Sequence, residues 1–372
     1  MRKGGVFVAK VYMADLKTGQ ESLLRKVDRL ITASGMDQFI DKGDLVAIKI
    51  HFGEPGNTGY VRAQYVRRLV DRLVKLGAKP FLTDANTLYV GRRANAVDHL
   101  QSAVLNGFDF AVAGAPVIIA DGLTGKDAVN VPIEGKHFRE VKIGSAVVYA
   151  DALIAVTHFK GHEATGFGGV LKNLGMGCGS RAGKQMMHSD VLPVVDEEKC
   201  TGCGKCNRWC PTGAALVVEK KNRIDQDKCI GCGECTVTCG EHAIAINWKT
   251  EPDVIQEKIV EHAMGVLANK TGKAGFLSFV TNVSPDCDCC NWSDAPIVRN
   301  IGILASLDPV ALDQAAVDLV NQEAALPDGR LAGLAPGTDK FRTLYPTVDW
   351  ERQLAYAQAM GLGTRDYELV RI

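Results

Sequence analysis

The sequence predicts an α/β fold: a mostly parallel sheet covered by helices on both faces, with a small α+β domain inserted in it. Apolar runs of strand length alternate with amphipathic helical segments along most of the 372 residues. Hydrophobic residues make up 46% of the chain, which is enough for a sizeable core. Eleven of the 12 cysteines fall between Cys200 and Cys290, so one segment differs in composition from the rest.

Charge and hydropathy exclude several classes of protein. Lysine plus arginine and aspartate plus glutamate both number 43, so no overall field would attract nucleic acid or an anionic membrane. No run approaches about 18 consecutive apolar residues, so no membrane span is predicted. The apolar run near Met1 is too short for a signal peptide, and a cytoplasmic protein is expected.

The first part of the body is assigned to residues 1–193. Strands are predicted at residues 6–11, 45–50, 79–83 and 152–157. Helices are predicted at residues 21–33, 60–76 and 95–105. The first helix has apolar residues at helical spacing from Leu23 to Ile31, the second is ended by Gly77, and the third closes at Asn106 and Gly107. Residues 115–148 contain short strand-like runs and are expected to form a β excursion.

The alternation resumes in the second part of the body, residues 249–372. A helix is predicted at 252–267, strands at 276–281 and 301–305, and a helix at 309–321. Because these elements are expected to complete the same sheet, residues 194–248 are interpreted as an insertion.

Two cysteine runs repeat within this insertion at an offset of 29 residues. Both have the spacing C-x2-C-x2-C-x3-C, which binds [4Fe–4S] clusters in two-cluster bacterial ferredoxins. Glycines between the cysteines let the backbone approach the cluster sulfides closely. The runs therefore predict a ferredoxin-like α+β domain that holds two [4Fe–4S] clusters.

The fourth cysteine of each run is expected to bind the cluster of the other run. One cluster is therefore predicted on Cys200, Cys203, Cys206 and Cys239. The other is predicted on Cys229, Cys232, Cys235 and Cys210. Structural zinc is the alternative, but zinc ribbons use two C-x2-C pairs and need no third and fourth cysteine at this spacing. Gly240 stands where the first run has Pro211, a change expected to alter solvent access or potential without removing the cluster.

Polar and titratable residues follow the predicted strands where each one ends. Open α/β sheets bind ligands beyond the carboxyl ends of their strands, so these residues predict a reactive crevice. The candidate catalytic residues are His51, Glu54, Asp84, His158, Lys160 and His162. The cysteines after residue 281 and Asp308 after residue 306 are expected at the same edge. Any one of these residues could instead be a helix cap or turn residue, although caps do not need imidazoles.

Several motifs resemble the ferredoxin-containing DUF362 proteins of anaerobic bacteria and archaea. They are KIHFGEPGNT at 49–58, TDANT at 83–87, HFKGHEATGFGGVLKNLGMGC at 158–178 and the twin cysteine runs. The resemblance covers nearly the whole chain and implies two [4Fe–4S] clusters inserted in an α/β body. It implies no reaction, because the family is uncharacterised in general.

Four cysteines lie outside the two runs: Cys178, Cys287, Cys289 and Cys290. Three explanations stay open for them: a third metal centre, for which an iron–sulfur cluster fits best, a redox-active dithiol or disulfide, and ordinary free thiols. Adjacent cysteines diverge in an extended chain, so Cys289 and Cys290 could share one site only across a tight turn.

A glycine-rich lead into a helix precedes Lys172. Gly168, Gly169 and Lys172 are candidate cofactor-binding residues, because backbone N–H groups at a helix start bind phosphate or carboxylate groups. The order of a Walker A or G-x-G-x-x-G motif is missing, so a closely packed turn around a cofactor is an equal alternative.

These features predict a redox protein, with oxidoreductase as its expected enzyme class, that relays single electrons between an external carrier protein and the crevice. There the histidines, Glu54 and Lys160 would bind a small anionic substrate or shuttle protons, and Asp84 would orient an imidazole. Neither nucleic acid nor a membrane span is expected. Two other functions stay open: a pure electron carrier, and a carrier or assembly factor for iron–sulfur clusters.

Overall fold

The structure, a computed structural model, describes residues 8–19, 21–88, 91–188, 193–210, 212–229, 234–241, 243–245 and 251–372. Its centre is an eight-stranded sheet with the order β16-β1-β15-β14-β7-β2-β3-β4. The strands are β1 (Ala9–Asp15), β2 (Leu45–Ile50), β3 (Lys79–Asp84), β4 (Val117–Ile119), β7 (Ala152–His158), β14 (Ala274–Val280), β15 (Gly302–Ser306) and β16 (Tyr367–Arg371). The strand predicted at residues 6–11 begins at Ala9, and residues 1–7 lie outside the described part of the chain.

Strands β14, β7, β2, β3 and β4 pair in parallel, and β1 pairs in parallel with β16. Only β15 runs against its two neighbours, β14 and β1. The prediction of a mostly parallel α/β sheet is therefore confirmed. Strands that precede and follow residues 194–248 belong to this one sheet.

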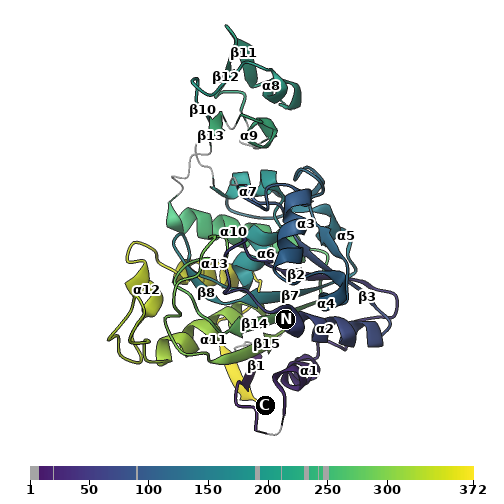
Figure 1. Cartoon of the computed structure of the whole chain (residues 1–372), viewed down its shortest axis with the longest axis vertical. Coiled ribbons are helices and arrows are strands. Elements are labelled where there is room, and N and C mark those ends of the chain that lie inside the picture. The colour runs from purple at the N-terminus through teal and green to yellow at the C-terminus, as the bar shows by residue number, and fades with distance from the viewer. Residues whose placement is uncertain are drawn as a thin grey trace, which may run out of the picture.

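Helices cover both faces of the sheet (Figure 1). On one face Val46, Ile48 and Ile50 of β2 pack with α1 (Leu23–Ser34) and α2 (Ala63–Lys75). On the other face Ala47 packs with a cluster from α6 (Val170–Cys178), α10 (Pro252–Leu267) and α11 (Pro309–Gln322). This alternation is the period-two pattern of a strand buried on both sides. The remaining helices of the body are α3 (Ala96–Leu105), α4 (Phe110–Ala113), α5 (Ser145–Tyr149), α7 (Arg181–His188), α12 (Lys340–Leu344) and α13 (Glu351–Ala359).

Two hairpins stand outside the main sheet of the body. Strands β5 (Ala128–Pro132) and β6 (Glu140–Gly144) form the first, which lies in the region expected to be a β excursion. Strands β8 (Lys160–His162) and β9 (Gly166–Gly168) form the second, directly after β7. The second hairpin turns the segment from Lys160 to Gly168 back over the carboxyl edge of the sheet.

The cysteine runs form a separate small unit at the narrow end of the molecule (Figure 1). Its elements are β10 (Val194–Val195), α8 (Lys205–Trp209), β11 (Ala215–Val218), β12 (Lys221–Ile224), α9 (Glu234–Thr238) and β13 (Ile244–Ala245). Strands β10 and β13 pair antiparallel, as do β11 and β12. Lys126 of the body contacts this unit, because its Nζ lies 3.6 Å from the ring centre of Trp209 and donates to Thr238 Oγ1 at 3.2 Å.

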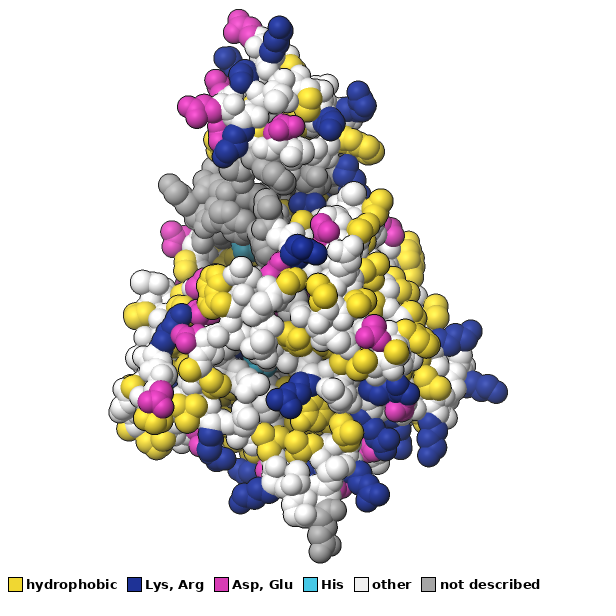
Figure 2. Space-filling view, viewed as in Figure 1, with side chains coloured by type: hydrophobic (Ala, Val, Ile, Leu, Met, Phe, Trp, Pro, Cys, Tyr) yellow, Lys and Arg dark blue, Asp and Glu magenta, His cyan; other side chains and the backbone are white. Residues whose placement is uncertain are grey.

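Positive and negative side chains are interspersed on the surface, with hydrophobic side chains among them (Figure 2). This mixture agrees with the equal numbers of acidic and basic residues. In the part of the chain that the structure describes, no helix combines the length and the apolar character needed to cross a membrane.

Candidate functional site

A cavity of about 410 Å³ lies at the carboxyl edge of the parallel strands. Because β14, β7, β2 and β3 run in one direction, the segments that follow them meet at this edge. The positive residues that line the cavity are Lys49, Arg93, Lys160, Lys172 and Lys184. The carboxylates that line it are Asp84 and Glu163. The cavity wall is therefore more positive than negative.

Asp308 was expected at this edge and lies elsewhere. Strand β15 is antiparallel to β14, so its carboxyl end is at the opposite edge of the sheet. There the Asp308 carboxylate accepts hydrogen bonds from the N–H groups of Val310 and Ala311, both at 2.9 Å, and caps α11.

Asp84 sits at the centre of a buried charge network. Its Oδ1 lies 3.0 Å from Lys49 Nζ, and its Oδ2 lies 3.5 Å from Arg93 Nη1 and 3.7 Å from His99 Nε2. Burial alone would raise the pKa of Asp84, but Lys49 and His99 hold it well below its usual range. Glu54 accepts from Arg93 Nε at 2.8 Å, so it holds this arginine in place.

His51 lines the cavity with a neutral ring. Burial, and then the positive charge of Arg93, hold the pKa of His51 well below its ordinary value. Its Nδ1 accepts a hydrogen bond from the N–H of Gly53 at 3.0 Å, so the proton lies on Nε2. This ring can therefore donate one hydrogen bond from Nε2.

His158 binds acceptors at both ring nitrogens. Its Nδ1 lies 2.9 Å from each carboxylate oxygen of Asp288, and its Nε2 lies 2.9 Å from the carbonyl oxygen of Thr281. Lys160 Nζ lies 3.2 Å from Asp288 Oδ2. Burial would raise the pKa of Asp288, but His158 and Lys160 lower it. His158 thus holds Asp288 and has no nitrogen left for a ligand.

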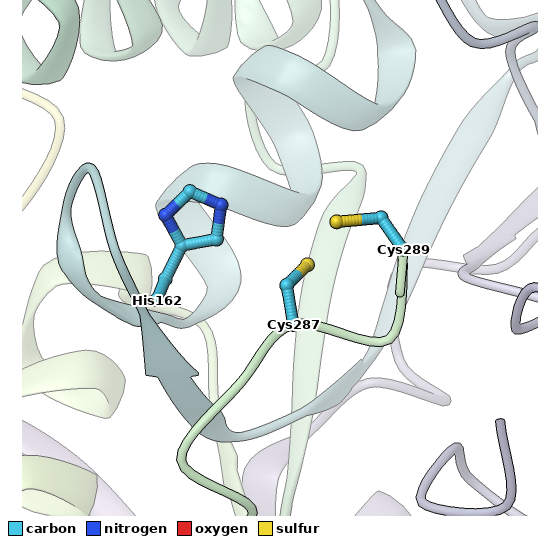
Figure 3. Close-up of side chains that lie close together, drawn as sticks. All are labelled: His162, Cys287 and Cys289. Atoms are coloured by element: carbon cyan, nitrogen blue, oxygen red, sulfur yellow. The ribbon is translucent and has the colours of Figure 1, made fainter. Parts of the chain in front are cut away.

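His162, Cys287 and Cys289 lie together on the cavity wall, with both sulfur atoms in the space beside the imidazole (Figure 3). One ligand atom from each lies within 4.8 Å of the others, which is close enough to hold a metal ion. Lys172 Nζ lies 3.7 Å from Cys287 Sγ. The hydrogen bond from Cys289 lowers the pKa of Cys287 well below that of an ordinary thiol, and Lys172 and His162 act in the same direction. The same hydrogen bond raises the pKa of Cys289.

The other two spare cysteines do not line the cavity, although the Cys290 side chain hydrogen-bonds with Cys289. Cys178 ends α6 inside the apolar core, where burial raises its pKa to about 11. Cys290 N–H donates to the carbonyl oxygen of Cys287 at 3.0 Å, which closes a tight turn through Asp288 and Cys289. Among the described residues the cavity is lined by Cys287 and Cys289, but by neither Cys178 nor Cys290.

The glycine-rich lead into α6 receives a carboxylate from its own chain. Asp313 of α11 accepts hydrogen bonds from Val170 N–H at 2.7 Å and Leu171 N–H at 2.9 Å. A Cβ atom on Gly169 would lie 2.3 Å from Asp313 Oδ1, so only glycine permits this approach. Gly168 and Lys172 line the cavity. The start of α6 thus binds the Asp313 carboxylate, while Lys172 points its charge at Cys287.

We expect Gly169→Ala to lower the free energy of unfolding by about 1–3 kcal/mol, because the new methyl group must displace the Asp313 carboxylate. Gly168→Ala is the matched control, since the nearest atoms to its Cβ would be the flexible side chains of Lys160, at 3.3 Å, and Lys172, at 3.5 Å. Chemical denaturation followed by circular dichroism measures both effects. Equal losses for the two variants would contradict the packing argument.

In the small unit, Cys200, Cys203, Cys206 and Cys239 line one cavity. This is the set that the spacing assigns to the first cluster. Asn222 N–H donates to Cys200 Sγ at 3.2 Å, and Ala243 N–H donates to Cys239 Sγ at 3.3 Å. Backbone N–H groups directed at sulfur suit thiolates that bind iron, so these four residues fit a [4Fe–4S] cluster.

The second run repeats part of this arrangement. Ala214 N–H donates to Cys210 Sγ at 3.1 Å, the counterpart of the bond from Ala243 to Cys239. Cys229 and Cys235 are described, whereas Cys232 and Pro211 lie outside the described residues.

Several residues at the crevice were missed from the sequence, among them Lys49, Arg93, Lys184 and Asp288. Asp288 carried a signal, since it lies between two cysteines in a segment already singled out. Arg93 lies in a loop, and Lys184 lies in α7, where it donates to the carbonyl oxygen of Gly179 at 2.6 Å. Burial lowers the pKa of Lys184 to about 8. Neither residue lies directly after the end of a strand, so no pattern marked it.

A family model described as a domain of unknown function, DUF362, matches residues 46–318. Comparison with curated proteins gives no match. Two solved structures are similar to part of the chain. The lactate racemase apoprotein from Thermoanaerobacterium thermosaccharolyticum has 14% identity and a TM-score of 0.38, over 73% of this chain and 50% of that one. A protein from Thermotoga maritima has 11% identity and a TM-score of 0.37, over 71% of this chain and 52% of that one. The chain thus spans about half the length of each.

Proposed function

The chain belongs to the DUF362 family, and we propose that it is an iron–sulfur redox protein. Its small unit exchanges single electrons with a carrier protein and passes them to or from the crevice of the α/β body. The observation that carries this proposal is the convergence of four cysteines from two separate runs on one cavity. Cys239 is 33 residues beyond Cys206 in the sequence, and both line that cavity. This arrangement is the one that two interlocked clusters require.

Two [4Fe–4S] clusters would supply one-electron chemistry when bound. Cys200, Cys203, Cys206 and Cys239 would hold one of them, and Cys229, Cys232, Cys235 and Cys210 the other. The backbone N–H groups of Asn222, Ala214 and Ala243 donate to ligand sulfurs and so favour the thiolate form. Such bonds are one of the means by which a protein sets the reduction potential of a cluster.

The crevice residues divide into those that bind and those that position. Lys172, Lys184 and the Nε2–H of His51 offer donors to a small anionic ligand. His158 and Lys160 hold Asp288, and Glu54 holds Arg93. A cavity of about 410 Å³ lined by buried charges favours a ligand site over a surface that only docks a carrier.

Quantification of metal and acid-labile sulfide in anaerobically purified protein tests the proposal. We expect about eight irons and about eight sulfides per chain, with the brown colour of [4Fe–4S] clusters. A colourless protein with zinc as its only stoichiometric metal would contradict the proposal. About twelve irons per chain would indicate a third cluster, which the crevice cysteines would have to hold.

A further inference from the structure

We propose that Cys287 and Cys289 form a redox-active pair that cycles between dithiol and disulfide and exchanges with small disulfides that carry carboxylate groups. This inference deepens the proposed function by naming the reacting groups of the crevice. It rests on that function only for the physiological supply of electrons, because the thiol chemistry needs no cluster.

The turn that carries the two cysteines is held from several sides. Asp288, between them, is fixed by His158 and Lys160. Asn57 Nδ2 donates to the carbonyl oxygens of Trp292 at 2.8 Å and Cys290 at 3.3 Å. These contacts place both sulfur atoms at the cavity wall within 4.8 Å of each other. Two thiols held this way lose little conformational entropy when they form a disulfide bond.

Cys287 is placed to react as a thiolate. Lys172 Nζ lies 3.7 Å from its sulfur, and the Nε2 side of the His162 ring faces the two sulfur atoms (Figure 3). The thiolate is the nucleophile in disulfide exchange, and a neighbouring ammonium group favours it. The opposite directions of the two pKa shifts, lower for Cys287 and higher for Cys289, give one thiolate and one thiol.

The same geometry argues against a metal ion at this place. His162 Nδ1 accepts a hydrogen bond from Ala164 N–H at 3.1 Å, so the ring N–H is on Nε2, toward the sulfurs (Figure 3). A histidine that binds a metal through one nitrogen normally donates from the other. The Lys172 ammonium group beside Cys287 would also repel a cation. Among the described residues the group offers three ligands, fewer than the four of a closed site.

The exchange balances in atoms and electrons. The Cys287 thiolate attacks one sulfur of R–S–S–R. The S–S bond of that external disulfide breaks, and R–S⁻ leaves. The Cys289 thiol gives its proton to R–S⁻, and the resulting thiolate attacks Cys287 Sγ and releases the second R–S⁻. The pair is oxidised by two electrons, and the external disulfide is reduced to one R–SH and one R–S⁻. The reverse sequence reduces the pair.

The charge of the cavity selects the disulfide. The cations that line the space beside the pair are Lys160, Lys172, Lys184, Lys49 and Arg93. Against these five stand the lining carboxylates of Asp84 and Glu163, with Asp288 and Glu54 paired to Lys160 and Arg93. A disulfide with carboxylate ends is therefore attracted and one with ammonium ends repelled. Dithiodipropionate and cystamine are probes of similar size and opposite charge.

The test uses the full chain with its clusters, purified anaerobically. After reduction and removal of reductant, the protein is exposed to each probe, alkylated and digested with trypsin. Residues 274–299 form one tryptic peptide that contains Cys287, Cys289 and Cys290 and no other cysteine, so its mass counts these thiols separately from the cluster ligands. We expect loss of two alkylatable thiols from this peptide, about tenfold faster with dithiodipropionate than with cystamine.

Three variants make the test specific. In Cys289→Ser the reaction should stop at a mixed disulfide between Cys287 and the probe. With dithiodipropionate this adds the mass of one disulfide-linked mercaptopropionate group to the peptide. Cys287→Ser should slow the reaction by at least about a hundredfold, because the thiolate is lost. Cys290→Ser, the matched control, should still form the disulfide like the unchanged protein.

Two results would overturn the inference. One is three alkylatable thiols in the peptide after exposure to either probe, in protein that carries its normal iron. The other is a metal bound stoichiometrically and lost in Cys287→Ser. Iron content tests the proposed function separately. Protein with about eight irons but an inert cysteine pair would contradict only the dithiol proposal. Protein with a reactive pair but no iron would contradict only the cluster proposal.

Discussion

Replacing Cys239 by alanine should remove about four of about eight irons from each chain, although Cys239 ends the second cysteine run. The reason is its position, on the cavity that Cys200, Cys203 and Cys206 also line. Without Cys239 that cluster loses one of its four thiolate ligands, whereas the other cluster keeps all four of its own. Iron and sulfide quantification, with electron paramagnetic resonance of the reduced protein, measures the loss.

Two double variants test whether the runs exchange their fourth ligands. Cys239→Ala with Cys203→Ala removes two ligands of one cluster and should lose no more iron than Cys239→Ala alone. Cys239→Ala with Cys235→Ala damages both clusters and should leave almost no iron. The reverse pattern would show that each run binds its own cluster with all four cysteines. Cys178→Ser, in the apolar core, should keep the full iron content.

Most of the strands and longer helices of the body followed from local patterns. Strand β2 and helix α10 have the predicted bounds, because their apolar periods and flanking residues are unambiguous. The direction of β15 could not be predicted, since an apolar run of five residues reads alike in both directions. Strand β16 was missed because its side chains are only partly buried and show little alternation. The direction of β15 depends on its neighbours, and the partial burial of β16 depends on the rest of the fold, so neither can be read from the segment alone.

The sequence predicted that residues following the strand ends line the crevice, but not which side chains bind one another there. His158 and Asp288 are 130 residues apart in the sequence, and Val170 and Asp313 are 143 apart. Their contacts depend on how the parallel strands and α11 assemble. Sequence patterns placed His51, Asp84, Lys160 and His162 near one edge. They did not reveal that His158 and Glu54 hold other side chains.

The largest change in stability is expected from Asp84→Asn, which removes one negative charge from a network with almost no exposure to solvent. Lys49 is 0% and Asp84 3% exposed at the side chain. The amide keeps the shape of the carboxylate but leaves the Lys49 ammonium group buried without its counter-ion. Breaking such a pair costs about 3–5 kcal/mol. Anaerobic chemical denaturation measures the free energy of unfolding. Asp71→Asn, in an exposed pair with Arg67, should change it by less than about 0.5 kcal/mol.

The pH dependence of this contribution has a definite sign. The pKa of Asp84 in the folded protein is well below its ordinary value of 3.8, so the carboxylate stabilises the fold at every pH above that value. Its contribution is lost only as the pH falls from there through the folded pKa. The difference between the unchanged protein and Asp84→Asn should therefore be constant across neutral pH and should shrink in acid.

A second substitution separates charge from packing in this network. If the loss in Asp84→Asn comes from an unpaired ammonium group, then Asp84→Asn with Lys49→Met should recover most of it, because the buried charge is gone and the methionine keeps most of the volume. If the loss came from the shape of the Asp84 site, the double variant would be no more stable than Asp84→Asn. Recovery of stability with loss of anion binding would then show that Lys49 is kept in the cavity wall for its charge and not for the fold.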